Sequence, residues 1–356
     1  MPFVIIRNDI TKVKADAIVN TANPRPVVGG GTDSAIYHAA GEELLLAERK
    51  KIGDIEPGQA VNTGAFNLDA KYIIHTVGPA WVDGNHGERE TLRSCYAQSL
   101  SLAADLLCES IAFPLIATGV YGFPKDEALN IALAEIGGFL LTHEMKVILV
   151  VFDRKALELS ERLAGEITEY IDEHAVGLLR KAEYGASIIQ RRRMDEERMI
   201  AAGRRRIDAV QPEEDLLELS IAPPSAASFP DVSGKSLDEV LGNYEDTFQQ
   251  RLFKLIDASG MDDVTVYKKA NIDRKVFSRI RCKADYTPKK KTAVAFAIAL
   301  ELDMPTMLDL LSRAEIAFSP SNKFDLIVSY FVTNGVYDIY RINAALFKYG
   351  QQTLGE

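Results

Sequence analysis

A glycine-rich stretch near the start of the chain combines residues that can bind an anion with residues that can move a proton. Residues 18–33 read Ile-Val-Asn-Thr-Ala-Asn-Pro-Arg-Pro-Val-Val-Gly-Gly-Gly-Thr-Asp, an apolar strand followed by a loop that opens a helix. Glycine lets a ligand approach backbone N–H groups, and a helix start adds the positive end of its dipole. Gly29, Gly30 and Gly31 therefore predict an anion-binding loop with Asn23 and Asp33 as polar neighbours, although a glycine triplet alone also fits a plain turn.

A second loop of small residues follows another apolar strand. It holds Thr118, Gly119, Val120, Tyr121 and Gly122, again between a predicted strand and a predicted helix. Neither loop has the GxGxxG spacing of a dinucleotide-binding fold or the GK[ST] of a P-loop. Two anion loops on one sheet would suit a diphosphate, and we expect backbone amides to bind it.

The elements that must position these loops alternate along the first half of the chain. Short β-branched runs predict strands, and longer amphipathic segments between them predict helices. The strands are expected at residues 4–6, 17–20, 59–63, 72–77, 111–116 and 147–152, and the helices at 33–51, 88–108, 125–143 and 155–173. Nearly continuous apolar strands separated by helices predict an α/β three-layer domain with a mixed sheet covered on both faces.

Composition narrows the functional class. The 356 residues include 41 basic and 51 acidic side chains, and 47% are hydrophobic, which is ordinary for a soluble globular protein. We see no apolar run of bilayer length and no charged-then-apolar leader, so we expect a cytoplasmic protein without a membrane contact. The three cysteines are far apart with no CxxC pair, so neither a disulfide framework nor a metal site is expected, and no cofactor is predicted.

Charge and composition divide the chain into three parts. Residues 1–174, the predicted α/β domain, carry the whole net charge of −10. Residues 175–235 begin with alternating blocks of basic and acidic residues, which fit a solvated ion-paired helix or a nucleic-acid-binding arm, and end in a linker rich in proline and serine. Residues 236–356 show almost only helical patterns, so we predict a second, all-α domain.

The second domain contains a strongly basic segment. Residues 264–291 hold ten basic and two acidic side chains. Their apolar spacing fits two short helices around a tight turn at Asn271, over residues 264–281.

Three motifs of the first half, taken in order, resemble the macrodomain family. They are the Asn-x-x-Asn strand end with its glycine triplet, Ile-His-Thr-Val-Gly-Pro at residues 74–79, and Phe-Pro-Leu-Ile-Ala-Thr-Gly-Val-Tyr-Gly-Phe-Pro at residues 113–124. The resemblance runs from about residue 3 to residue 172. It implies ADP-ribose binding, and in several branches of the family hydrolysis of ADP-ribose from proteins or deacetylation of O-acetyl-ADP-ribose.

The resemblance also implies residue roles. Asp9, followed by Ile10, would accept hydrogen bonds from the adenine amino group, and Phe152 would stack on adenine. The amides of Gly29–Gly31 and Thr118–Gly122 would hold the phosphates. Asn23 and Asp33 match the polar pair of the hydrolytic branch, in which one orients a ribose hydroxyl and the other holds or deprotonates a water. Asp33 could also be the N-cap of a helix that starts at Ser34.

Some residues depart from the hydrolytic pattern or fit a structural role. Tyr37 stands where that branch has histidine, His38 is shifted by one residue and so rotated by about 100° on a helix, and Val28 replaces a fourth glycine. His75 is interpreted as a hydrogen-bonded core histidine, and Trp81 as a residue that packs a loop.

The basic segment is similar to the helix-turn-helix of Cro/repressor-like proteins. That similarity implies that Arg274, Lys275, Ser278 and Arg279 face a DNA major groove. A helical interaction domain that no longer touches DNA fits the pattern equally well.

The functional prediction is an enzyme that removes mono-ADP-ribose from protein carboxylates or deacetylates O-acetyl-ADP-ribose. Its partner would be ADP-ribose or an ADP-ribosylated protein, with DNA or a protein bound by the helical domain. The alternative is a non-catalytic ADP-ribose sensor coupled to that helical domain.

Overall fold

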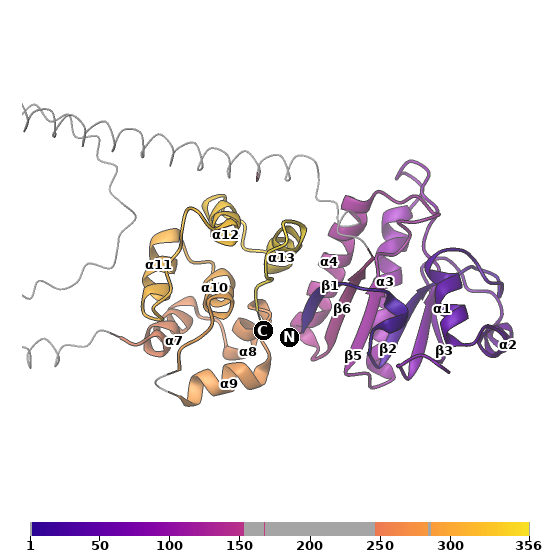
Figure 1. The fold of residues 1–356 in the computed structure, drawn as a ribbon, viewed down its shortest axis with the longest axis horizontal. Coiled ribbons are helices and arrows are strands. Elements are labelled where there is room, and N and C mark those ends of the chain that lie inside the picture. The colour runs from indigo at the N-terminus through magenta and orange to yellow at the C-terminus, as the bar shows by residue number, and fades with distance from the viewer. Residues whose placement is uncertain (1, 153–166, 168–245, 284–285, 356) are drawn as a thin grey trace, which may run out of the picture.

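The computed structural model describes residues 2–152, 167, 246–283 and 286–355 and shows an α/β unit beside a helical unit (Figure 1). The α/β unit comes from the first 152 residues and the helical unit from residues 246–355. Apart from residue 167, the predicted helix at 155–173, the charged helix and the linker lie outside the described residues.

The α/β unit follows the predicted alternation of strands and helices. Its elements are β1 (Phe3–Arg7), η1 (Ile10–Lys12), β2 (Ala17–Thr21), α1 (Thr32–Ala40), α2 (Glu42–Ile52), β3 (Ala60–Gly64), β4 (Tyr72–Thr76), α3 (Glu88–Asp105), β5 (Ser110–Pro114), α4 (Lys125–Thr142) and β6 (Lys146–Val151). The helical unit has α7 (Phe248–Ser259), α8 (Asp263–Lys269), α9 (Arg274–Cys282), α10 (Lys290–Ala299), α11 (Met304–Ser312), α12 (Lys323–Thr333) and α13 (Ile339–Lys348).

The strands form one mixed six-stranded sheet in the order β1-β6-β5-β2-β4-β3. All neighbouring strands are parallel except β3 and β4, which are antiparallel. A parallel connection needs a crossover, and the helices between the strands supply it. The predicted mixed sheet is therefore confirmed.

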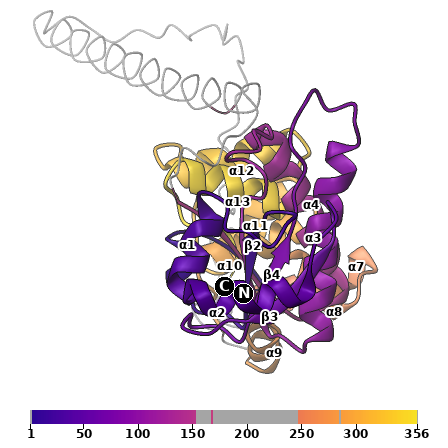
Figure 2. The ribbon, with the colours of Figure 1, turned by 90° about the vertical axis from the view of Figure 1, so that its right-hand side faces the viewer.

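Helices cover both faces of the sheet. In Figure 2, α1 and α2 lie on one side of the sheet and α3 and α4 on the other. Ile18 and Ile73 of adjacent strands belong to the core on the α1–α2 side, whereas Val19 and Ile74, the next residues along, belong to the core on the α3–α4 side. All four side chains are fully buried. Burial on both faces explains why β2 and β4 read as largely apolar runs, and it confirms the three-layer prediction.

The predicted single helix at residues 33–51 is wrong. The structure has two helices, α1 and α2, that meet at Gly41. Gly41 adopts φ = +99°, a backbone conformation that other residues rarely take. Glycine therefore ends one helix and begins the next, which changes the direction of the chain.

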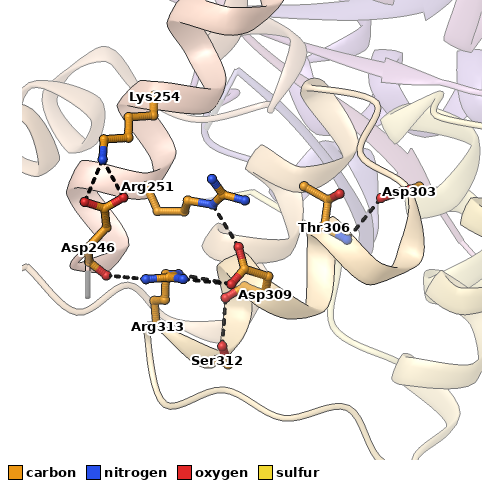
Figure 3. A network of polar contacts seen from close by, with 8 residues as sticks. All are labelled: Asp246, Arg251, Lys254, Asp303, Thr306, Asp309, Ser312 and Arg313. Atoms are coloured by element: carbon orange, nitrogen blue, oxygen red, sulfur yellow. Dashed lines mark hydrogen bonds and ion pairs between the residues drawn. The ribbon is translucent and has the colours of Figure 1, made fainter. Parts of the chain in front are cut away.

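Ion pairs join the first and the fifth helix of the helical unit (Figure 3). Arg251 of α7 donates from Nε to Asp309 of α11 at 2.8 Å, and Arg313 donates to the other oxygen of Asp309 at 3.0 Å. Arg313 also donates to the backbone carbonyl of Asp246 at 2.9 Å. These half-exposed contacts connect the start of the unit to its middle.

Asn271 joins the two units by completing the edge of the sheet. Its side-chain oxygen accepts from the Phe3 backbone N–H at 2.9 Å, and its side-chain nitrogen donates to the Phe3 carbonyl at 3.0 Å. Phe3 lies on β1, an edge strand whose outward backbone groups would otherwise lack a partner inside the interface. Asn271 sits in the predicted turn between α8 and α9 with φ = +54°, a conformation that asparagine tolerates better than most residues.

The helical unit lies beside α4 and β1 (Figure 1), and side chains near Asn271 and on α13 contact them. Tyr267 donates its hydroxyl to Glu144 at 2.8 Å, and the buried Lys268 donates to the Leu141 carbonyl at 3.3 Å. The ring of Tyr340 meets that of Phe3 edge-on, with centroids 5.3 Å apart. One apolar core consequently runs from the α3–α4 face of the sheet into the helical unit.

Among the helices that the structure describes, none combines the length and the apolar character needed to span a bilayer.

Replacing Asn271 by glycine tests the junction. Glycine keeps the positive φ but removes both hydrogen bonds to Phe3, so we expect the free energy of unfolding to fall by about 2 kcal/mol or more. Urea denaturation measures this loss, and hydrogen exchange of the N-terminal strand should become faster. Asn334→Gly is the matched control, because Asn334 is exposed and gives up one hydrogen bond at a helix end. Equal losses in both variants would contradict the role of Asn271.

Candidate functional site

Four neighbouring parallel strands end in a row at one edge of the sheet. In the order β1, β6, β5 and β2 they deliver Asp9, Phe152, the loop at 118–122 and the glycine-rich loop. Strands lie about 4.8 Å apart, so the row extends over about 14 Å. The carboxyl edge of a parallel sheet is where ligands bind in α/β folds. The structure therefore gathers residues from four distant parts of the sequence into one elongated site.

The glycine-rich loop has two backbone amides available to a ligand. The N–H of Gly29 donates to Asp33 Oδ2 at 2.5 Å and is occupied. Gly30 and Gly31 are exposed, and their N–H groups form no hydrogen bond within the described part of the chain. Gly31 has φ = +63°, which turns the backbone immediately before α1. Gly30 and Gly31 thus match the expected amide donors, whereas Gly29 does not.

The second loop presents a similar set of donors. Its ends are closed by hydrogen bonds from Gly122 N–H to the Gly119 carbonyl and from Phe123 N–H to the Ala117 carbonyl, both at 3.0 Å. The amides of residues 118–121 have no partner among the described residues. Ala117 starts this turn with φ = +63°, an uncommon conformation for a residue with a Cβ, and such strain often accompanies function.

Asp33 lies beneath the glycine-rich loop rather than at its surface. Its side chain is 2% exposed, and its oxygens accept from Gly29 N–H and, at 2.6 Å, from the side-chain nitrogen of Asn20. Burial raises the pKa of the Asp33 carboxyl, and the two hydrogen bonds oppose that rise. The N-cap alternative is wrong, since α1 begins at Thr32 with Gly31 at the N-cap.

A chain of buried polar groups fixes Asp33 from behind. Asn20 uses its amide nitrogen twice, toward Asp33 and toward His75 Nδ1 at 3.2 Å, and His75 Nε2 lies 2.9 Å from the Thr63 hydroxyl. Because Nδ1 accepts from Asn20, we assign the ring proton to Nε2, which donates to Thr63. Burial lowers the pKa of His75 to about 3, so the imidazole is neutral. His75 is confirmed as a hydrogen-bonded core residue.

Asn23 reaches the site from the end of β2. Its side chain is half-buried, and its oxygen accepts from the Arg25 backbone N–H at 3.2 Å. No hydrogen bond joins Asn23 to Asp33 in the described part of the chain. The two residues are connected by the glycine-rich loop, which begins after Asn23 and ends before Asp33. The nitrogen of the Asn23 side chain is left to donate to a ligand.

The other end of the row carries an acid and an exposed aromatic ring. Asp9 N-caps the short helix η1, where Thr11 donates to its carboxylate from both N–H and hydroxyl and so lowers the pKa of Asp9. Ile10 is buried in the core under α1 and is placed to support the strand end rather than to touch a ligand. Phe152 is 80% exposed, which is unusual for phenylalanine. Its ring is therefore accessible to a flat ligand that could stack on it.

The residues that depart from the hydrolytic pattern point in opposite directions. Tyr37 is 2% exposed, and burial raises the pKa of its hydroxyl to about 12, so it remains protonated at neutral pH. His38 is exposed on the other side of α1, as its rotation on a helix predicted. Val28 packs against the core under α1. None of the three offers a second proton acceptor to Asp33.

A loop beside the second anion loop is held by one buried acid. Glu88 accepts backbone N–H groups from Val82, Asp83, Gly84 and His86. Asp83, His86 and Glu88 are the one set within the described residues with metal-ligand proximity, but the Glu88 carboxylate is committed to these amides. Trp81, as predicted, packs this loop, with its ring 4.6 Å from that of Phe123.

The predicted groove-facing residues of the helical unit are all exposed. Arg274, Lys275, Ser278 and Arg279 point outward from α9, whereas Phe277 and Ile280 of the same helix are buried. The two helices and the turn at Asn271 were predicted correctly.

Two residues of the site, Asn20 and Arg49, have no role predicted from the sequence. Asn20 stands in an otherwise apolar strand, and a polar residue in a fully buried strand signals an internal hydrogen-bond partner. Arg49 of α2 is 1% exposed, and its Nη2 donates to the Pro24 carbonyl at 3.3 Å. Nothing in its lysine- and glutamate-rich surroundings distinguishes Arg49 from a surface residue.

Comparison with known proteins identifies the family. The Macro domain model matches residues 19–132. A Macro domain-containing protein of Methanosarcina mazei is 44% identical over 165 residues, which are 46% of this chain and 88% of that protein. An O-acetyl-ADP-ribose deacetylase of Citrobacter rodentium is 45% identical over 164 residues, which are 45% of this chain and 93% of that protein. The Oceanobacillus iheyensis macrodomain solved with ADP is 39% identical, with a TM-score of 0.42 over 43% of this chain and 85% of that one. Through its α/β unit, this chain belongs to the macrodomain family.

Proposed function

We propose that the protein binds ADP-ribose along the row of strand ends and hydrolyses esters of it. The observation that supports binding is the order of the groups along that row. Asp9 and Phe152 suit adenine, the free amides of Gly30, Gly31 and residues 118–121 suit the diphosphate, and Asn23 with Asp33 suits the distal ribose. Amide donors explain how the acidic residues 1–174, with their net charge of −10, could hold a dianion without lysine or arginine.

Hydrolysis is assigned to Asn23 and Asp33. Asn23 would donate its free side-chain N–H to a ribose hydroxyl, which orients the ester. Asp33 would accept a proton from the attacking water, and burial makes its carboxylate a stronger base than an exposed aspartate. Relatives 45% identical to this chain are named O-acetyl-ADP-ribose deacetylase, which supports this class of reaction. The substrate is an acyl ester of ADP-ribose, on a protein carboxylate or on acetate.

Variants of the polar pair test the reaction. We expect Asn23→Ala and Asp33→Asn each to lower kcat by about 100-fold or more, because each removes a group that acts on the reacting ester or water. Release of ADP-ribose from a protein carrying carboxylate-linked mono-ADP-ribose measures the rate. Activity of the intact chain should fall toward acidic pH as Asp33 becomes protonated, and the raised pKa of Asp33 places this fall above the pH expected for an exposed aspartate.

The control variant is Asp105→Asn, which removes a carboxylate from the exposed end of α3 at the opposite edge of the sheet. It should retain the activity of the intact chain. If the intact chain binds ADP-ribose in calorimetry but releases none, the enzyme proposal fails, and the protein is a sensor of ADP-ribose whose output lies in the helical unit.

We also propose that α9 binds duplex DNA. All four predicted contact residues are exposed, and α8 and the turn at Asn271 are engaged with the α/β unit, which leaves the basic side of α9 facing outward. Lysine and arginine on one helix face attract phosphates.

The DNA proposal is tested on the full chain by the salt dependence of duplex binding. Replacing Arg274 and Lys275 together by alanine should weaken binding and reduce the slope of log K against log [salt] by about two. Arg341→Ala, which removes an exposed charge from α13, should leave the slope unchanged. Absence of salt-dependent binding by the intact chain would show that the helical unit serves another partner.

A further inference from the structure

Arg49 is a buried cation directly behind the candidate pair. It lies on α2 and is 1% exposed, although burying an arginine costs several kcal/mol unless its donors are satisfied. Its hydrogen bonds go to backbone carbonyls, those of Gly53, Pro24 at 3.3 Å and Asn23 at 3.5 Å. Within the described residues it forms no ion pair with a carboxylate.

The carbonyls that Arg49 contacts belong to the functional loop. Asn23 and Pro24 form the bend where β2 becomes the glycine-rich loop, and the Pro24 carbonyl also accepts from the Ile55 N–H at 2.9 Å. Holding this bend from below sets the position from which the Asn23 side chain projects. A helix that packs under the loop thus restrains one member of the pair by hydrogen bonds to its backbone.

The charge of Arg49 acts on the other member. Its positive charge lowers the pKa of the Asp33 carboxyl against the opposing effect of burial, and it also helps to keep His75 neutral. Arginine stays protonated even when buried, so this charge is permanent. The other polar or titratable groups that act on Asp33 are uncharged at neutral pH; they are the Gly29 amide, Asn20, Tyr37 and Tyr121.

We infer that Arg49 is a positioning residue of the hydrolytic site, one that holds the Asn23 backbone and supplies the fixed positive charge behind Asp33. The inference rests on the proposed function for its kinetic part only. Arg49 does not reach the ligand; it acts through Asn23 and Asp33. Arg49 reaches the Asn23 and Pro24 carbonyls from α2, and α2 is separated from α1 by the turn at Gly41.

Two substitutions separate the two effects. Arg49→Met removes the charge and the hydrogen bonds, so kcat should fall on the order of tenfold with little change in KM, and the acidic limb of the pH profile should move to higher pH. Arg49→Lys keeps a charge but is a point donor that cannot span several carbonyls. It should leave the acidic limb near that of the intact chain while kcat stays reduced.

A measurement without turnover makes the inference independent of the enzyme assignment. The carboxyl ¹³C signal of Asp33, identified by its loss in Asp33→Asn, should titrate at higher pH in Arg49→Met than in the intact chain, and at nearly the unchanged pH in Arg49→Lys. Arg93→Met is the matched control, because it removes an arginine from α3 that is half-exposed and paired with Glu135.

The outcomes are distinct. If the intact chain is inactive but the Asp33 titration shifts as expected, the proposed hydrolysis and the kinetic role of Arg49 fail, and its electrostatic role toward Asp33 stands. An Asp33 titration that is unchanged in Arg49→Met, or that shifts equally in Arg93→Met, overturns the inference. If Arg49→Met does not fold, Arg49→Lys still decides, since an Asp33 titration that moves to higher pH although the charge is kept also overturns it.

Discussion

The site depends on one buried carboxylate. Asp33 carries a charge into the interior, where an unsatisfied ion is costly, so its neighbours must supply hydrogen bonds or positive charge. Gly29 and Asn20 supply the bonds, His75 and Thr63 continue them to β3, and Arg49 supplies the charge. The hydrogen bond from Gly29 N–H to Asp33 stabilises the carboxylate and also fixes the position of the glycine-rich loop. A change to any of these groups therefore alters the loop and the acid together.

The parallel sheet gives that carboxylate its surroundings. Parallel strands align their carboxyl ends, so the order β1-β6-β5-β2 alone decides which loops become neighbours. Two of these loops contain backbone at positive φ, at Gly31 and Ala117, which turns amides toward open space. The binding site that we propose uses these backbone groups, so the acidic net charge of the unit does not oppose it.

The helical unit packs against β1, the edge strand on the side of the sheet opposite β3. An edge strand needs partners for its outward backbone groups, and Asn271 provides both a donor and an acceptor to Phe3. The turn between α8 and α9 thus packs inside the molecule, and the outer face of α9 remains exposed. The continuous apolar core at this junction means that the two units are packed together rather than only tethered by the intervening chain.

Much of this could be predicted from residue types and order. The strands were evident because burial on both faces requires largely apolar runs, and the two loops were evident because glycine and small residues recur after strands. The turn at Asn271 and the burial of His75 followed from local pattern as well. These features depend on near neighbours in the chain, so the sequence by itself determined the α/β class, the loops and the candidate pair.

Tertiary structure alone decided which groups meet. In one straight helix from residue 33 to 51, Arg49 would lie about 24 Å along the axis from Asp33; the break at Gly41 instead brings it beneath the loop. The sharing of Asn20 between Asp33 and His75, and the use of Asn271 to complete β1, join residues up to 268 positions apart. Hydrogen bonds at such separations leave no local periodicity, because they are set by how helices and strands pack.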